Sequence, residues 1–291
     1  MISESFAEKT YPDDVYVRLQ TELLVIGDSL MTDRHHASNG NYDADDPQNQ
    51  IGGIIPSFSL SGWLRHGMEK VVQKRGTTPC HPGESNANFL KEGVYSRDLE
   101  SGYHEKGACL DDDGNGCIVL DLFGGFSNRP GKFMRRPISF TPVRSSVDYT
   151  RGQAEGHYRR LNRNIVSRNP DDGREPLRNT ELDAVANLDG SWHLSFRERK
   201  PEFVGLLAEA IDFLGAHQTD MLHQLGGARN FGGGIVDCSL VNPLYTEREL
   251  KRVFDRTKRP TESMLEKHDE WENDLRPAFV AALEERIAAD S

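Results

Sequence analysis

Residues 54–72 read IIPSFSLSGWLRHGMEKVV, and within this stretch the sequence pattern changes from strand to helix. Pro56 ends a short apolar run, and Ser57 or Ser59 can cap a helix that follows. Apolar residues then recur at helical spacing, at Leu60, Leu64, Met68, Val71 and Val72. The stretch therefore predicts a helix over about residues 59–73 that is preceded by a strand.

Further elements are expected on both sides of this helix. Residues 15–31 are rich in leucine and β-branched residues and predict a strand, as does the apolar run CIVLDLFG at residues 117–124. Residues 202–217, EFVGLLAEAIDFLGAH, predict a second amphipathic helix. Residues 235–245 follow a glycine-rich loop and predict another strand.

Residues 179–199 alternate through Trp192, Leu194 and Phe196, which predicts a hairpin with Asp189-Gly190 as its turn. The expected order is then strand, helix, strands, hairpin, helix and strand. This order predicts an α+β fold of the ferredoxin-like type that carries insertions. A doubly wound α/β fold would need more alternating helices.

The composition limits the class of protein. The chain has 291 residues, with 35 Lys+Arg against 46 Asp+Glu and a net charge of −11. It has no apolar run of about 18 residues and no signal-peptide pattern at its start, so we expect a cytoplasmic protein with no membrane partner. Its four cysteines are too few for a disulfide scaffold and are expected to be reduced or bound to metal.

The charge is distributed unevenly along the chain. Residues 129–178 hold 12 Lys+Arg and 5 Asp+Glu, a local charge of +7, which leaves −18 on the remainder. Eleven of the 12 basic residues are arginines, and arginine makes planar, bidentate contacts to phosphate. The block fits a phosphate-binding surface, or else a solvated face that answers acidic neighbours.

The loop LGGARNFGGGIV at residues 225–236 joins the second helix to the last strand. Its glycines would let backbone N–H groups approach a phosphate closely. It is not a Walker A loop, because no Lys-Ser/Thr follows the glycines. A permissive turn is the alternative interpretation.

Four segments together resemble one known family. IIPSFSLSGWLR is similar to the IPGSSLKGxLR motif at the first helix of RAMP proteins, and DLFG at residues 121–124 to their LFG. RNTELDAVANLDGSWHLSFR resembles their E-x-V-P-x-G-T-x-F strand pair, and LGGARNFGGGIV their signature loop LGG-x-x-x-R-G-x-G-x-V. The matches occur in the family's order from Leu23 to Leu244. The chain is therefore identified as similar to the RAMP superfamily, the RNA-binding backbone subunits of type I-D, III and IV CRISPR effector complexes.

The resemblance implies a domain organisation. It implies an RRM-like palm made of residues 1–75, 117–128 and 179–245. It also implies a cysteine-containing insertion at residues 76–116, an arginine-rich thumb at residues 129–178 and a charged helical tail at residues 246–291.

The resemblance further implies that the palm and thumb bind CRISPR RNA along a helical filament. The residues expected to hold the RNA are Ser59, Ser61 and Arg65 in the first helix, Arg135, Arg136, Arg159 and Arg160 in the thumb, and Gly226, Gly227, Arg229, Gly232 and Gly233 in the glycine loop. Phosphate contacts of this kind position a strand without reading its sequence. Expected partners are CRISPR RNA, target RNA or DNA, copies of the same chain and other subunits of an effector complex.

A zinc site is expected in the insertion. The candidate ligands are Cys80, His81, Cys109 and Cys117, and His104 could replace His81. Thiolates and imidazole suit tetrahedral zinc, and several RAMP backbone subunits carry zinc in the insertion before LFG. The spacing is irregular, so unrelated reduced cysteines remain the alternative.

Two enzymatic alternatives stay open. In relatives that cut target RNA, an aspartate between the first strand and first helix acts with a divalent cation such as Mg²⁺, and Asp45 or Asp46 lies near that place. The segment VIGDSLM around Ser29 matches the GDSL motif of one esterase class, with Asp220 and His223 as the other triad members. The RAMP matches are longer and more numerous than this one.

Overall fold

In a computed structural model of the chain, the described residues are 14–28, 54–55, 57–79, 117–126, 133–134, 137–144, 158–166, 177–198, 200–220, 223–225, 234–255 and 257–290. The strands are β1 (Asp14–Asp28), β2 (Ile54–Ile55), β3 (Gly125–Phe126), β4 (Phe133–Met134), β5 (Ile138–Phe140), β6 (Val143–Arg144), β7 (Tyr158–Val166), β8 (Leu177–Phe196) and β9 (Asp237–Leu240). The helices are α3 (Ser57–Lys74), α6 (Ile118–Phe123), α8 (Pro201–Ala216), α9 (Glu247–Val253), α10 (Glu262–Glu270), the π-helical turn η5 (Trp271–Leu275) and α11 (Arg276–Asp290). Among these helices, none combines the length and the apolar character that a membrane crossing needs.

The main sheet is antiparallel, with strand order β5-β8-β1-β9 and with β7 paired to the far part of β8. β1 pairs with β8 from Asp14 opposite Ser195 to Asp28 opposite Leu182. Along β1, Val15, Val17 and Leu19 are fully buried while the residues between them are partly exposed. This alternation gives the sheet one buried face and one open face.

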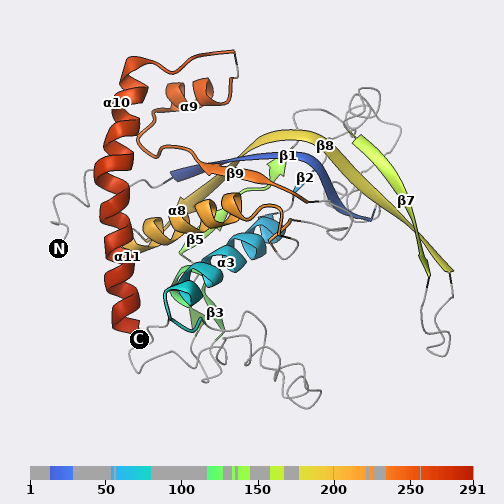
Figure 1. Cartoon of the computed structure of the whole chain (residues 1–291), viewed down its shortest axis with the longest axis horizontal. Helices are drawn as coiled ribbons and strands as arrows, with labels where there is room; N and C mark the ends of the chain where they lie inside the picture. The colour runs from blue at the N-terminus through green and yellow to red at the C-terminus, as the bar shows by residue number, and fades with distance from the viewer. Residues whose placement is uncertain are drawn as a thin grey trace.

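Two long helices cover the buried face, as Figure 1 shows for α3 and α8 below the sheet. All five apolar residues that predicted the first helix are buried in the core: Leu60, Leu64, Met68, Val71 and Val72. The helix begins at Ser57, two residues before the predicted start. The predicted second helix is α8, and the α+β class is confirmed by this combination of helices and antiparallel sheet.

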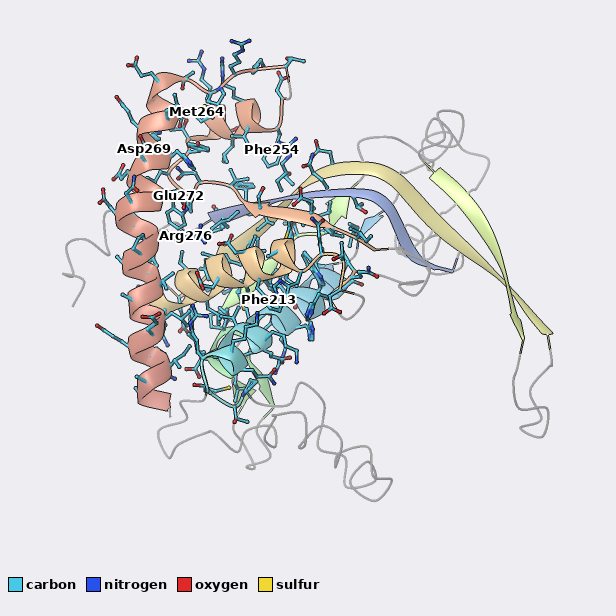
Figure 2. All side chains as sticks on the ribbon, in the orientation of Figure 1. Phe213, Phe254, Met264, Asp269, Glu272 and Arg276 are labelled. Atoms are coloured by element: carbon cyan, nitrogen blue, oxygen red, sulfur yellow. The ribbon has the colours of Figure 1, made fainter. Side chains whose placement is uncertain are left out.

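The C-terminal helices belong to the same core. α11 packs along α8, and its buried residues continue the core from the π-helical turn to the end of the chain: Trp271, Leu275, Phe279, Leu283 and Ile287. Arg286 also donates to Asp121 at 2.9 Å. Figure 2 shows α11 running across the end of α8, with Arg276 labelled near that crossing. The segment predicted as a charged helical tail is therefore an integral part of the described structure.

The predicted hairpin turn at Asp189-Gly190 is wrong. β8 continues through both residues, with Asp189 opposite Gln20 and Gly190 opposite Leu19. Arg18 donates to both carboxylate oxygens of Asp189, at 3.0 and 2.8 Å. A two-residue turn of this sequence needs left-handed backbone, and Gly190 does not adopt it. Pairing with β1 outweighs the local turn preference.

The predicted strand at residues 117–124 is also wrong, because residues 118–123 form the short helix α6. Five of its six residues are buried, so the run is apolar on nearly every side and carries no periodicity that separates helix from strand. Gly124 ends the helix with φ of 64° and donates its N–H to the carbonyl of Leu120 at 2.8 Å.

The arginine-rich block contributes strands to all three sheets, because β6 pairs with β2, β4 pairs with β3, and β5 and β7 both pair with β8. β5 joins the main sheet by pairing with the end of β8, and β7 pairs with β8 from Tyr158 opposite Val185 to Val166 opposite Leu177. Because β1 ends opposite Leu182, the last part of the β7–β8 pair extends beyond it as a two-stranded ribbon. Figure 1 shows this ribbon projecting away from the helices.

The packing of α11 on α8 can be tested at Gly205. A Cβ at this position would collide with the backbone carbonyl of Phe279, which cannot move like a flexible side chain. We expect Gly205→Ala to lower the free energy of unfolding by about 1–3 kcal/mol, measured by urea unfolding. Gly62→Ala in α3 is the control, because no atom lies within 4 Å of its Cβ position and alanine favours the helix. Equal stability of Gly205→Ala and wild type would contradict this helix packing.

Candidate nucleic-acid interface

The start of α3 and the glycine loop meet in the structure. Trp63 donates its indole N–H to the backbone carbonyl of His223 at 2.6 Å, across 160 residues of chain. On the sheet side, the hydroxyl of Thr21 donates to the carbonyl of Ile235 at 2.7 Å. Both ends of the glycine loop are thus tied to elements that the sequence places far away.

The two ends of the loop are also tied to each other. Leu225 donates its N–H to the carbonyl of Gly234 at 2.9 Å. Gly234 has a φ of 84°, and a Cβ there would collide with the carbonyl of Leu225. Only glycine fits this position without strain. The predicted RNA-binding residues between these ends lie outside the described residues: Gly226, Gly227, Arg229, Gly232 and Gly233.

The predicted residues of the first helix lie in its first half. Ser59 and Ser61 are partly exposed, and Ser59 stands inside the first turn rather than at the cap, because the helix begins at Ser57. Arg65 donates to Glu69 at 2.7 Å and lies 5.7 Å from the ring centre of Phe123. With its side chain only 13% exposed, Arg65 would have to leave Glu69 to reach a phosphate.

Three ionisable side chains form a chain of contacts beside the loop. His66 and His223 share a hydrogen bond of 2.9 Å between Nε2 and Nδ1, and His223 Nε2 lies 3.4 Å from a carboxylate oxygen of Asp220. His223 is 6% exposed, and burial lowers its pKa. Asp220 opposes this shift, whereas the nearby basic side chains of His217, Lys70 and Lys74 add to it. His223 is therefore neutral near pH 7.

This geometry bears on the esterase alternative. Asp220 and His223 do lie side by side, but both ring nitrogens of His223 are already engaged. A triad histidine needs one nitrogen for the acid and the other for the nucleophile. Ser29 lies outside the described residues. The engaged Nδ1 removes the group that would accept the proton of a serine hydroxyl.

Several other predicted residues also lie outside the described residues: Asp45, Asp46, Cys80, His81, His104, Cys109, Arg135 and Arg136. Of the predicted zinc ligands, Cys117 is described, and it is buried just before α6. Within the described part of the chain, no group of three His, Cys, Asp or Glu could hold a metal ion. Arg159 and Arg160 lie on β7 opposite Ala184 and Asp183.

His66, Lys70, Lys74 and His217 are not among the residues predicted from the sequence, although all four lie around this corner. The last two are in contact, with 3.5 Å between Lys74 Nζ and His217 Nε2. The available signal was the four-residue spacing from His66 to Lys70 to Lys74 within a predicted helix. His217 carried no such signal, because its neighbours come from another element.

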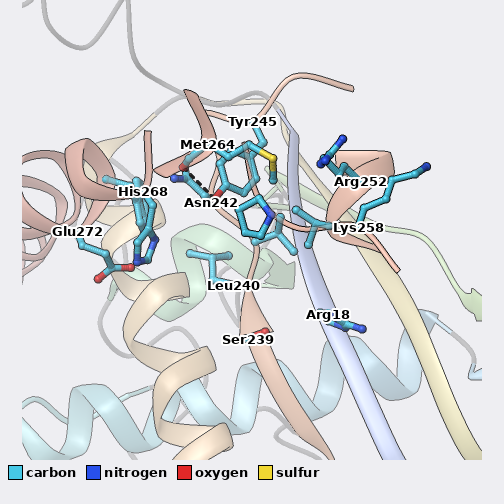
Figure 3. Close-up of a pocket in the computed structure, with 14 residues that line it drawn as sticks. Arg18, Ser239, Leu240, Asn242, Tyr245, Arg252, Lys258, Met264, His268 and Glu272 are labelled. Carbon is cyan, nitrogen blue, oxygen red and sulfur yellow. Dashed lines mark hydrogen bonds between the residues drawn. The ribbon is translucent and has the colours of Figure 1, made fainter. Parts of the chain in front are cut away.

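A second candidate is a cavity of about 320 Å³ between β9 and the C-terminal helices (Figure 3). Its cations are held by the chain's own groups, since Arg18 pairs with Asp189 and Lys258 with Asp255. Tyr245 donates to the carbonyl of Met264 at 3.3 Å, the dashed contact in Figure 3. These contacts engage polar groups that line the cavity with one another or with neighbouring residues, so the corner beside the glycine loop is the better candidate interface.

No protein-family model matches the chain, and no curated protein matches it. Among solved structures it is similar to a chain of the type III-B Cmr-beta complex bound to cognate target RNA, at 14% identity and a TM-score of 0.40. That match covers 83% of this chain and 64% of the other, so the chain spans less than two thirds of this neighbour. It is also similar to Csc2 of Thermofilum pendens, at 11% identity and a TM-score of 0.41, over 100% of this chain and 88% of the other.

Neither of these two solved structures identifies a family for the chain. Their TM-scores are below 0.5 and their identities are low. What the chain binds therefore follows from its own residues and not from these two structures.

The closed ends of the glycine loop generate a prediction at Gly234. Alanine there must adopt a positive φ and also collide with the carbonyl of Leu225. We expect Gly234→Ala to lower the free energy of unfolding by about 1–3 kcal/mol. Gly76→Ala is the control, because Gly76 has a φ of 88° but nothing within 4 Å of its Cβ position. If the two variants are equally stable in urea, the close contact of Leu225 and Gly234 is not present.

The buried His223 predicts a pH effect. Because its pKa is lowered in the folded state, the unfolded chain binds more protons once the pH falls below the ordinary histidine pKa of about 6.5. Stability contributed by neutral His223 is complete above that pH and is lost as the pH falls toward the folded-state pKa. The melting temperature of His223→Asn should therefore fall less than that of wild type between pH 7.5 and 5.5. The control is His268→Asn, because His268 is exposed, and its melting temperature should change with pH as that of wild type does. A His223→Asn melting profile parallel to that of wild type would contradict the assignment.

Proposed function

We propose that the chain is a CRISPR RNA-binding backbone subunit of the RAMP type, with a ferredoxin-like palm that holds the guide strand. The observation that carries the proposal is the bond from Trp63 to the carbonyl of His223. It holds the first-helix motif against the residue two positions before the glycine-loop motif, and the family resemblance selects these two motifs independently. A chance match of two short motifs gives no reason for them to meet.

The topology supports the palm. The sheet order β5-β8-β1-β9 places the second and third strands of a βαββαβ unit side by side and the fourth beside the first, when β5 is taken as the second strand. The helices α3 and α8 lie on the same face, as such a unit requires. In the proposal, the thumb includes the part of the β7–β8 ribbon that extends beyond the end of β1.

The charge pattern supports RNA as the ligand. Residues 129–178 carry +7 inside a chain of −11, and Arg159 and Arg160 of this block lie on β7. Phosphate neutralisation by arginine supplies affinity without reading bases, which suits a subunit that must accept any guide sequence. In the proposal, copies of the chain follow one another along the guide and, with other subunits, present it to target nucleic acid.

The first test is the RNA that accompanies the protein. Purified protein from its native cells should carry nuclease-protected RNA whose sequenced ends derive from CRISPR repeats. In a binding assay, replacing Arg159 and Arg160 with Ala should weaken all guide sequences alike. The slope of log affinity against log salt should become flatter by about 0.7 for each lost phosphate contact on a single strand.

The control replaces Lys251 and Arg252 of α9 with Ala, because these residues lie away from the proposed RNA path. It should bind RNA as wild type does. Wild-type affinity in the Arg159 and Arg160 variant, combined with a loss in the α9 variant, would place the RNA elsewhere and overturn the assignment of the thumb.

A further inference from the structure

A row of four residues follows one side of α3, spaced four apart: Gly62, His66, Lys70 and Lys74, which we call the α3 ridge. Residues four apart lie one above another on a helix. All four are partly or fully exposed. The row spans 12 residues, or about 18 Å at 1.5 Å per residue. It begins beside Trp63, and therefore beside the glycine loop.

Among the described residues, the two lysines of the ridge have no carboxylate partner. The other described lysines all pair with one: Lys200 with Glu198, Lys251 with Glu247, Lys258 with Asp255 and Lys267 with Glu249. Lys70 instead donates to the amide oxygen of Gln73 at 3.0 Å. In a chain of net charge −11, two unpaired ammonium groups on one helix side leave a local positive potential.

The surroundings of Lys74 are short of acceptors. Its Nζ lies 3.5 Å from Nε2 of His217 and 4.4 Å from the ring centre of Phe213. An ammonium group can only donate, so His217 must accept at Nε2 and carry its own proton on Nδ1. That Nδ1 is buried and has no hydrogen-bond partner among the described residues. Donors thus outnumber acceptors here, an imbalance that an anion would reduce.

Gly62 adds an independent observation. Glycine inside a helix costs about 1 kcal/mol relative to alanine. Gly67 has a packing reason, because a Cβ there would lie 2.8 Å from the side chain of Leu214. At Gly62 no atom of the described residues lies within 4 Å of the Cβ position. The described part of the chain therefore leaves open space beside the helix backbone at this point, where a ligand can approach closely.

We propose that the α3 ridge binds the phosphodiester backbone of single-stranded RNA and extends the RNA path from the glycine loop along α3. This proposal rests on the RNA-binding function proposed above. Lys70 and Lys74 contact phosphates, and Gly62 lets the strand approach where it leaves the loop. A ridge of about 18 Å is long enough for its two lysines to contact separate phosphates of one strand.

The test uses the full chain and a fluorescently labelled single-stranded RNA of about 30 nucleotides and mixed sequence. We expect the double variant Lys70→Gln and Lys74→Gln to flatten the salt slope by about 1.4, which at 0.15 M salt is roughly a tenfold loss of affinity. The matched control is Lys251→Gln with Lys258→Gln, which removes the same charge from lysines that are paired with carboxylates. The control should bind RNA as wild type does.

A second variant tests the open end of the ridge. Gly62→Glu places a carboxylate where no atom of the chain interferes, so the protein should still fold, and binding should weaken about tenfold by repulsion. Ala281→Glu, at an exposed position of α11, is its control. Melting temperatures of all variants establish that each is folded.

The outcomes separate the two proposals. If wild type binds no RNA, the proposed function and the ridge both fail. If wild type binds RNA and the Arg159 and Arg160 variant binds it weakly, while both ridge variants match wild type, the ridge is overturned and the proposed function stands. Weaker binding in both ridge variants, with both controls unchanged, supports the ridge.

Discussion

The antiparallel pairing of β1 with β8 is the constraint on which the rest of the structure depends. These two strands run together from Asp14 opposite Ser195 to Asp28 opposite Leu182, and each remaining strand of the main sheet attaches to one of them. A slip of one residue would turn the buried alternate residues of β1 to the open face. It would remove the apolar surface on which α3 and α8 rest, and with it the corner where the first helix meets the glycine loop.

That corner is built from apolar packing with a few specific polar ties. Trp63 is buried, and its indole N–H is satisfied by the carbonyl of His223, so the indole fixes the loop end as well as filling the core. Gly234 then lets the loop close on Leu225. The two described ends of the loop are thus held against each other and against α3.

The elements predicted correctly are those whose burial can be read from the pattern of their own residues. The first helix was found because its apolar period is matched by burial at every predicted position from Leu60 to Val72. The turn at Asp189-Gly190 was predicted wrongly because a turn preference is a local signal. The strand pairing with β1 and the two hydrogen bonds from Arg18 come from a segment 171 residues away. Residues 117–124 were misread because an apolar run buried on nearly all sides has no period. The packing of the C-terminal helices was missed for the same reason as the strand pairing, since its partner lies on α8.

Charge pairing is the part of the site that sequence could least supply, and it also explains how an acidic chain can hold a polyanion. The carboxylates of Glu69 and Glu209 lie near the α3 ridge, yet each is bound by an arginine, Arg65 at 2.7 Å and Arg75 at 2.5 Å. Carboxylates farther away are screened, because exposed charges interact weakly beyond about 8–10 Å at physiological salt. In the proposed complex, an RNA strand along the ridge would therefore meet the local charge and not the net charge of −11. The sign of the local electrostatic potential depends on which carboxylates are bound by basic side chains. These ion pairs are determined by the fold.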